Sequence, residues 1–322
     1  MVQYFERNRF SVVLFLTVIT TILVYSNTFS SSFHLDDINN IVKNTWIQDI
    51  SNFLNFSGTR YIGNLSFALN YHLGGLNVFG YHLVNIIIHI LNGILVWWFV
   101  VLTFNTPLLE KVAANRWLSG LIALASCLLF VSHPIQTQAV TYIVQRYASL
   151  ATLFYLLSIV LFVKWRLSSG FRYRLVFYLF SVLSAVLAMK TKEISFTLPF
   201  IIVLYEVTFF RDKLRRAYYL IPYLLTLLII PLNFVDIGID DPFGHMAGEL
   251  SEAARETASI SRGTYLLTQF RVIVTYIRLL LFPVNQNLDY DYPLYHSFFI
   301  PGVFLSFLFL LFIAGLAVYL YI

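Results

Sequence analysis

The sequence predicts an all-α protein, a bundle of helices that cross a membrane several times. Hydrophobic residues make up 59% of the 322 residues. Only 11% of the residues are charged, whereas about 25% are charged in a soluble domain. So few charges cannot cover a globule of this size in water, so the bilayer is its natural solvent. Aromatic residues reach 18%, which suits lipid-facing surfaces and interfacial belts.

Nine apolar segments are candidates for spans, each of which needs roughly 20 apolar residues to cross the hydrocarbon core. They are 10–29, 81–104, 117–132, 147–164, 175–189, 196–210, 217–234, 265–283 and 298–321. Several are short, and Arg271 and Arg278 interrupt one of them. We therefore expect about eight or nine spans. They should form a single transmembrane domain over 1–322, with no separate soluble domain.

Basic residues indicate the orientation of the spans. The N-terminal segment and three alternate short loops hold twelve of the 21 basic residues: Arg7, Arg9, Lys111, Arg116, Lys164, Arg166, Arg172, Arg174, Arg211, Lys213, Arg215 and Arg216. By the positive-inside rule this side, with the N-terminus, is cytoplasmic. The long loops 30–80 and 235–264 and the short loops 133–146 and 190–195 then face outward. The net charge of +5 reflects this topology, and no nucleic-acid partner is expected.

An acidic pair, Asp36-Asp37, directly follows the first span. A carboxylate at this boundary can act as a general base, or the pair could hold a divalent cation such as Mg²⁺ or Mn²⁺. Partial burial would raise the pKa of such a carboxyl group. The alternative is an interfacial Asp that caps a helix beginning at Ile38. The residues alone leave both readings open, and no other cofactor is indicated.

Three basic residues lie on the outer side, against the positive-inside bias: Arg146, Lys190 and Lys192. Their recurrence favours binding of an anion such as a lipid phosphate. The alternative is an internal ion pair of Lys190 or Lys192 with Glu193. Arg271 could likewise meet a lipid phosphate, or it could snorkel to the surface, because an arginine in an apolar run costs several kcal/mol unless it is paired or hydrated.

Two patterns of polar residues occur at helical spacing. Gln138, Tyr142 and Gln145 would form one polar face of a helix that lines an outer cavity, or an ordinary interfacial helix end. A second stripe lies on the span 81–104 and consists of His82, Asn85, His89 and Asn92. For this stripe we favour hydrogen bonding between packed helices, with His82 as the best functional candidate.

Motifs of other enzyme classes are missing from the sequence. No Walker loop, zinc motif, Ser-His-Asp arrangement or dinucleotide fingerprint is found, so chemistry driven by cytoplasmic nucleotides is not expected. The single cysteine, Cys127, lies in an apolar run and cannot build a disulfide framework or a cysteine-based metal site.

Four motifs occur in an order that resembles a known family. FHLDDINNIVKN is followed by RYIGNLSFALNYHLGGLNVFGYHLVNIIIHILN, HPIQTQAVTYIVQR and KTKEISFTLP. This set is similar to the transmembrane and tetratricopeptide-repeat O-mannosyltransferases and their bacterial relatives, which are GT-C glycosyltransferases. The similarity covers most of residues 30–210, without the family's C-terminal repeats. It departs from the family at Gln138, where a Glu is common.

The resemblance implies a GT-C-like fold and transfer of a sugar from a polyprenyl- or dolichyl-phosphate donor. It implies that Asp36 or Asp37 is the catalytic carboxylate at the outer face, acting on a protein hydroxyl or a glycan. Arg146, Lys190, Lys192 and Arg271 are then candidates for binding the donor phosphate. We expect the cavity to be lined by His34, Arg60, His82, His133, Gln138, Tyr142, Gln145 and Glu193.

Two other functions fit the same pattern. A non-enzymatic transporter or flippase of lipid-linked glycans would use the polar stripe and the arginines as a path, although such sites usually lie near the midplane and between repeats. An inactive assembly subunit would have no outer cavity around the acidic pair. We expect a multi-pass protein of the bacterial inner membrane rather than of the endoplasmic reticulum, in contact with membrane lipids.

Overall fold

The structure, a computed structural model, describes residues 9–54, 58–111, 115–210, 218–232, 260–288, 290 and 292–321. Within these ranges the regular structure is helical and no strand occurs. The chain forms two compact units, residues 1–237 and 238–322, which we describe one at a time. The predicted single domain over 1–322 stays a prediction.

Seven helices are long and apolar enough to cross a membrane. They are α2 (Arg9–Tyr25, extended by η1, Ser26–Ser30), α5 (Val78–Phe104), α8 (Arg146–Leu167), α9 (Phe171–Met189), α10 (Leu198–Tyr205, flanked by η7, Glu193–Thr197, and η8, Glu206–Phe210), α14 (Arg262–Leu281) and α15 (Pro301–Tyr321). An eighth span results if α6 (Arg116–Ser132) is joined to the helical stretch Pro134–Thr141 across a bend of 49°. The remaining candidate, 217–234, is a shorter interrupted helix that includes α11 (Ile221–Leu225) and α12 (Ile229–Leu232). The multi-pass helical fold is thereby confirmed.

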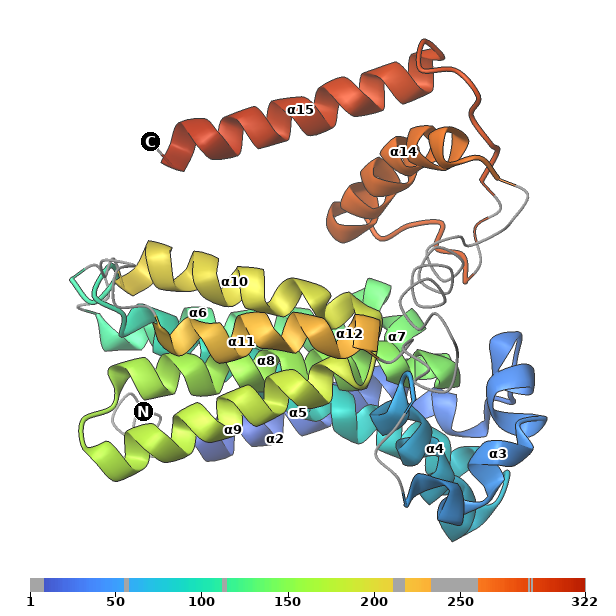
Figure 1. The fold of residues 1–322 in the computed structure, drawn as a ribbon, viewed down its shortest axis with the longest axis horizontal. Coiled ribbons are helices and arrows are strands. Elements are labelled where there is room, and N and C mark those ends of the chain that lie inside the picture. The colour runs from blue at the N-terminus through green and yellow to red at the C-terminus, as the bar shows by residue number, and fades with distance from the viewer. Residues whose placement is uncertain are drawn as a thin grey trace, which may run out of the picture. The chain divides into compact units, whose positions relative to one another are not determined.

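The helices of the first unit run alongside one another, and their ends form two groups (Figure 1). The short helices α3 (Thr45–Gln48) and α4 (Tyr61–Gly74) of the first outer loop lie at one end. At that end Ile62 N donates to Lys190 O at 3.1 Å. At the opposite end Leu108 N donates to Phe209 O at 3.3 Å. These contacts join loops that the charge pattern assigns to the same side of the membrane.

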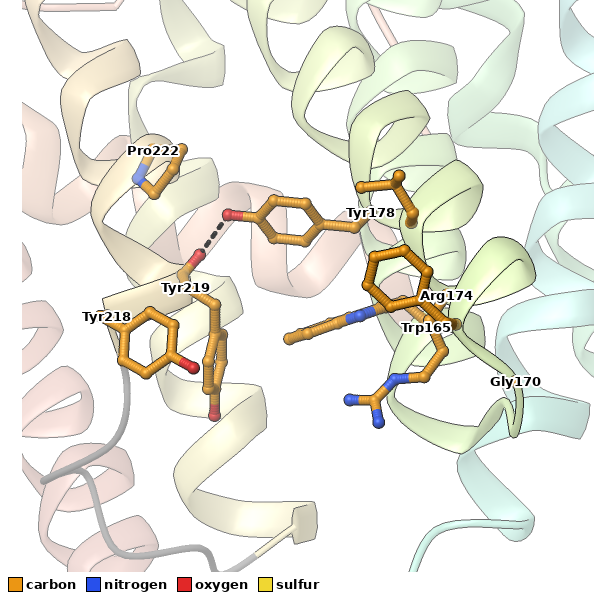
Figure 2. A pocket seen from close by; sticks show the side chains of 9 residues that line it. Trp165, Gly170, Arg174, Tyr178, Tyr218, Tyr219 and Pro222 are labelled. Carbon is orange, nitrogen blue, oxygen red and sulfur yellow. Dashed lines mark hydrogen bonds between the residues drawn. The ribbon is translucent and has the colours of Figure 1, made fainter.

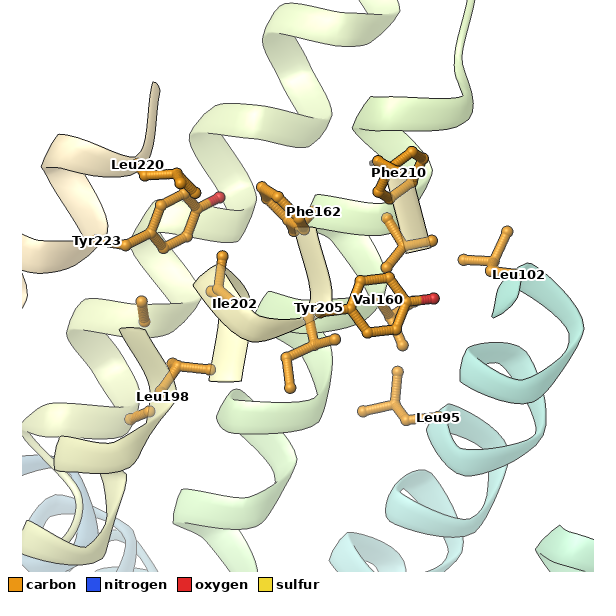
Figure 3. Packing of buried hydrophobic residues seen from close by; sticks show 14 residues of the cluster. Leu95, Leu102, Val160, Phe162, Leu198, Ile202, Tyr205, Phe210, Leu220 and Tyr223 are labelled. Carbon is orange, nitrogen blue, oxygen red and sulfur yellow. The ribbon is translucent and has the colours of Figure 1, made fainter. Parts of the chain in front are cut away.

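The larger apolar core of this unit lies between α5, α8, α9, α10 and α11 (Figure 3). Phe162 of α8 is fully buried and packs edge-on against Tyr223 of α11. Small residues let α8 and α9 approach closely, since Ser158 and Ser181 each donate a hydroxyl to the other's carbonyl at 2.9 and 2.6 Å. This reciprocal pair holds α8 against α9 near the middle of both helices.

The polar stripe on α5 has the packing role that the sequence favoured. All four side chains are buried. Asn85 Nδ2 donates to Val140 O at 3.2 Å and Asn92 Nδ2 to Ser149 O at 3.0 Å, while His89 Nε2 lies 3.1 Å from Val131 O. Each of these side chains therefore satisfies backbone groups of a neighbouring segment, and these contacts confirm the packing role.

In the second unit α14 packs against α15. Arg271 Nη1 lies 3.5 Å from Ser306 Oγ, and the side chain lies close to Gly302. Arg278 Nη1 donates to Val284 O at 3.2 Å. Most of the predicted outer loop 235–264, including its helix-like stretch, lies outside the described residues.

Candidate functional site

Asp37 is a buried carboxylate that holds the first outer loop against the start of α8. Its side chain is 1% exposed. One oxygen accepts from His34 N at 3.0 Å and the other from Val144 N at 2.7 Å. Burial raises the pKa of this carboxyl group, although the two backbone hydrogen bonds act in the opposite direction. The carboxylate does not cap the helix that begins at Ile38, so the capping alternative is wrong.

Asp36 is the exposed member of the pair. Its backbone N–H donates to the Tyr142 hydroxyl at 2.9 Å, and its carboxylate is also within hydrogen-bonding reach of that hydroxyl. Burial, together with the charges of Asp36 and Asp37, raises the pKa of the Tyr142 phenol. Leu35, with a φ of 46°, adopts the left-handed conformation that leucine rarely takes. Backbone strain of this kind is often found at functional sites.

The segment 133–146 is not one helix, so the predicted polar face does not form. The chain is helical over α7 (Thr137–Thr141), becomes extended at Tyr142 with ψ of 110°, and turns again over η6 (Ile143–Gln145). The break has a tertiary cause, because the Val144 N–H that a continuous helix would use internally is bound by Asp37. Gln138 and Gln145 are both partly buried and lie on either side of the break.

Arg146 is a structural residue, which corrects the predicted donor-binding role. It has no exposed surface. Its guanidinium donates to Asn85 Oδ1 at 2.7 Å, Asn70 Oδ1 at 2.6 Å, Ser66 O at 3.2 Å and Tyr81 O at 2.8 Å. It also lies over the Phe67 ring, 4.5 Å from the centroid. The charge therefore stabilises the packing of α4, α5 and α8 and does not reach an outer ligand.

Lys192 and its neighbours form a cationic edge at the same end of the unit. Glu193 pairs with Arg60 of the first loop (Oε1 to Nε, 3.0 Å), a partner that was not predicted from the sequence. No hydrogen bond from the Lys192 ammonium to another described residue is seen. Burial and the nearby Arg60 lower the pKa of Lys192, which Glu193 partly offsets. Burial also lowers the pKa of Lys190.

The three histidines of the predicted cavity have different surroundings. His34 is exposed, with Nε2 3.2 Å from Ser32 Oγ. His82 is fully buried with Nε2 2.9 Å from Ser31 O, and no described residue bonds its Nδ1. The Nδ1 of His133 accepts from Ile135 N at 3.2 Å and caps a short helix. Of the three, His34 alone is exposed beside the acidic pair.

Sequence reasoning missed the contact that fixes α4 on α8. Tyr147 donates its hydroxyl to Asn64 Oδ1 at 2.5 Å, and its ring lies against Gly63. Arg60 lies 5.6 Å from the centroid of the same ring. Gly63 and Asn64 belong to the GNLSFALN tract. The small and polar residues of that tract, within an amphipathic helix, were the signal that could have identified this contact.

Most of the predicted site residues therefore lie at one end of the first unit. Asp36 donates its backbone N–H to the Tyr142 hydroxyl, and Asp37 accepts from Val144 N two residues further along. The neighbouring edge consists of Arg60 at the start of α4 and of Lys192 and Glu193 at the start of η7. Arg271 belongs to the second unit and packs there against α15. Among the described residues, no group of three or more His, Cys, Asp or Glu side chains is arranged to hold a metal ion.

Comparisons with known proteins give the chain's relatives. It is 32% identical to protein O-mannosyl-transferase TMTC2 of Homo sapiens over 212 residues, which are 60% of this chain and 24% of that protein. It is 26% identical to a protein O-mannosyl-transferase of Caenorhabditis elegans over 297 residues, 86% of this chain and 39% of that protein. This chain is a relative of the protein O-mannosyl-transferases. The family resemblance of the four sequence motifs is thereby confirmed.

The O-mannosyl-transferase relatives are longer than this chain. It spans between about a quarter and two fifths of their length, as the 24% and 39% coverage show. No family model matches the chain. No solved structure matches it either. The two relatives are animal proteins, so they give no support to the expectation of a bacterial inner membrane.

Proposed function

We propose that the chain is the membrane part of a glycosyltransferase that moves a sugar, mannose by analogy with its relatives, from a lipid-phosphate donor. The acceptor is a hydroxyl of a protein or glycan at the outer face. The observation that carries this proposal is Asp36, an exposed carboxylate at the end of the first span whose turn is anchored by the buried Asp37.

In the proposed reaction Asp36 is the general base. It accepts the proton of the acceptor hydroxyl, whose oxygen attacks the anomeric carbon of the donor. The bond from that carbon to the phosphate oxygen breaks, and the lipid phosphate leaves with the bonding electrons. Lys192 stabilises the negative charge of the leaving phosphate, and Lys190, two residues before it in the chain, adds to the positive charge there. Asp37 acts as a positioning residue because both of its oxygens already accept backbone hydrogen bonds.

A divalent cation is compatible with the acidic pair. Both Asp37 oxygens accept backbone hydrogen bonds, so Asp36 is the member of the pair that would hold Mg²⁺ or Mn²⁺, together with the donor phosphate. We derive no step through a metal ion. A Mg²⁺ or Mn²⁺ requirement is tested by measuring transfer with EDTA and after adding each ion back.

The test compares two carboxylates of the first outer loop in purified full-length protein, with a polyprenyl-phosphate mannose donor and a serine/threonine peptide or glycan acceptor. We expect Asp36→Asn to lower kcat by about 10²- to 10⁴-fold, the usual contribution of a general base, with an unchanged unfolding temperature. Asp49→Asn is the matched control, because Asp49 is exposed in the same loop and its amide replacement still accepts from Ser51 N.

Three outcomes would contradict the proposal. Full transfer by Asp36→Asn would remove the base from the mechanism. Movement of the lipid-linked sugar across vesicle membranes without any transfer would favour the flippase alternative. Equal losses in Asp36→Asn and Asp49→Asn would indicate a general effect of loop charge and no specific base.

A further inference from the structure

The first unit has a pocket at the end opposite to the acidic pair (Figure 2). It measures about 650 Å³ and lies between the junction of α8 and α9 and the start of α11. Its lining is mostly aromatic and comprises Trp165, Gly170, Phe171, Arg174, Leu175, Tyr178, Tyr218, Tyr219 and Pro222. The Tyr178 hydroxyl donates to Tyr219 O at 2.8 Å and bridges the two walls. This volume is within the range of pockets that bind small ligands.

One cation of the lining is exposed. The guanidinium of Arg174 lies 5.6 Å from the Trp165 ring centroid, and no carboxylate is paired with it among the described residues. Arg166, which follows Trp165 in the chain and lies 5.8 Å from its ring centroid, is engaged differently, since its Nη2 pairs with Glu206 Oε1 at 2.9 Å. Tyr219 donates to the same carboxylate at 2.5 Å, so Glu206 is already satisfied. The Arg166–Glu206 ion pair thus holds Tyr219 in the wall of the pocket and neutralises its own charge. Arg174 remains able to bind an anion.

The pocket lies at the level of a membrane surface. Helix α8 begins at Arg146, near the acidic pair, and has 22 residues. At 1.5 Å per residue it is about 33 Å long, close to the roughly 30 Å thickness of the hydrocarbon core. Trp165 stands near its far end, and the rim residues Phe171 and Tyr218 are 81% and 76% exposed, as interfacial aromatic residues are.

The surrounding sequence is strongly basic. Residues 164–174 and 211–219 contain eight Lys or Arg residues and a single acidic residue, Asp212. Such clusters attract the anionic lipids of the cytoplasmic leaflet. A soluble anion would gain little from an aromatic lining, whereas a phospholipid can place its phosphate on Arg174 and its glycerol and upper acyl carbons among the rings.

We propose that this pocket binds one anionic phospholipid of the cytoplasmic leaflet, with the headgroup phosphate on Arg174 and the lipid body between Trp165, Tyr178 and Tyr219. The site is separate from the outer acidic pair, and it holds whether or not the sugar transfer proposed above is correct.

The test is native mass spectrometry of the purified full-length chain, titrated with phosphatidylglycerol and with phosphatidylcholine of the same acyl chains. We expect one molecule of phosphatidylglycerol to bind tightly and phosphatidylcholine to bind more weakly. Arg174→Gln should raise the Kd for phosphatidylglycerol by roughly fivefold, as loss of one cation near a membrane surface predicts. Arg172→Gln is the matched control, since it removes the same charge from the same helix and does not line the pocket. Leu175→Trp should fill the pocket and weaken both lipids.

Three results would overturn the proposal. Equal effects of Arg172→Gln and Arg174→Gln would indicate general electrostatic attraction. Equal binding of the two lipids by the wild-type protein would exclude headgroup recognition. Competition by free glycerol phosphate at the lipid's own concentration would mean that the ligand is a small anion. The unfolding temperature of each variant, measured without lipid, shows whether it has folded.

Discussion

Asp36 and Asp37 are adjacent in the chain, yet their carboxylates have opposite environments. The left-handed Leu35 and the bond from Asp37 N to His34 O at 2.9 Å form a tight turn before them. Asp37 turns inward to Val144, and Asp36 remains exposed beside Tyr142. This geometry divides the two roles that the sequence could not assign, with Asp37 holding the loop and Asp36 available to a substrate.

Asp37→Asn should destabilise the protein by about 1–3 kcal/mol, the cost of an unsatisfied buried donor, because an amide has one acceptor oxygen for two N–H donors. In the folded wild-type protein the pKa of the Asp37 carboxyl group is raised above 3.8, so with rising pH this group loses its proton first in the unfolded state. Stability is therefore lost as pH rises from 3.8 through the folded pKa. This contribution should vanish in the variant, and denaturant unfolding across that pH range measures it.

The matched variant for this measurement is Asp49→Asn, since Asp49 is exposed in the same loop. The difference in stability between wild type and Asp37→Asn should change with pH, whereas Asp49→Asn should not reproduce that change. A pH-independent difference for Asp37→Asn would show that the carboxyl group does not titrate differently in the folded protein.

Lys192 should make binding of a polyprenyl phosphate sensitive to alkaline pH. Burial and Arg60 lower its pKa, so the ammonium is lost below the ordinary lysine value of 10.5. We expect the Kd to rise with pH before 10.5 is reached, as the protonated form disappears. Lys192→Arg should flatten this profile because a guanidinium stays charged. Equilibrium binding of a fluorescent polyprenyl phosphate measures both curves.

Lys43→Arg is the control for this profile, because Lys43 is exposed in the first outer loop and has no assigned role. A wild-type profile that is already flat up to 10.5 would contradict the role given to Lys192. So would a Lys192→Arg profile that keeps the wild-type slope.

At the scale of elements, the contact between α4 and α8 positions the outer end of the unit. Arg146 and Tyr147 begin α8, and their side chains bind Asn70 and Asn64 of α4. A buried guanidinium that donates to neutral oxygens is costly to leave unsatisfied, so this contact tolerates little displacement. It brings Arg60, at the start of α4, into its ion pair with Glu193.

Gly63→Ala should disrupt this contact. A Cβ there would lie 2.2 Å from Cδ1 of the Tyr147 ring, which is itself buried. Overpacking of this kind typically costs 1–3 kcal/mol, so we expect about that loss of unfolding free energy. Gly74→Ala in the same helix is the control, because a Cβ there meets nothing within 4 Å. Denaturant unfolding that finds both variants equally stable would contradict the packing described here.

At the scale of the whole chain, the topology is tested by cysteine labelling. The one native cysteine, Cys127, is buried, so background labelling should be low. We expect Leu54→Cys, at a position that is 85% exposed in the first loop, to react with an impermeant maleimide added from outside. Ser169→Cys, at the exposed turn between α8 and α9, should react only after permeabilisation. Labelling of both from one side would reject the assigned orientation.

Much of the fold followed from the sequence because bilayer burial leaves a strong one-dimensional signal. Apolar runs marked the helices, and the basic loops sorted their ends into two groups that the contacts of the first unit respect. The helix expected to carry Gln138, Tyr142 and Gln145 on one face did not form for a physical reason. The Val144 N–H is bound by Asp37, which precedes it by 107 residues in the chain.

Composition, residue spacing and motifs predicted a multi-pass helical protein, the packing role of the α5 stripe and the relationship to the O-mannosyl-transferases. Three-dimensional contacts were needed to show that Asp37 is the buried acid of the pair and that Arg146 is internal. Composition and spacing report how apolar a segment is and which face it presents. They do not report which distant backbone or side-chain group forms hydrogen bonds with a charged side chain. Those partners decide whether a carboxylate or guanidinium supports the fold or remains available to a ligand.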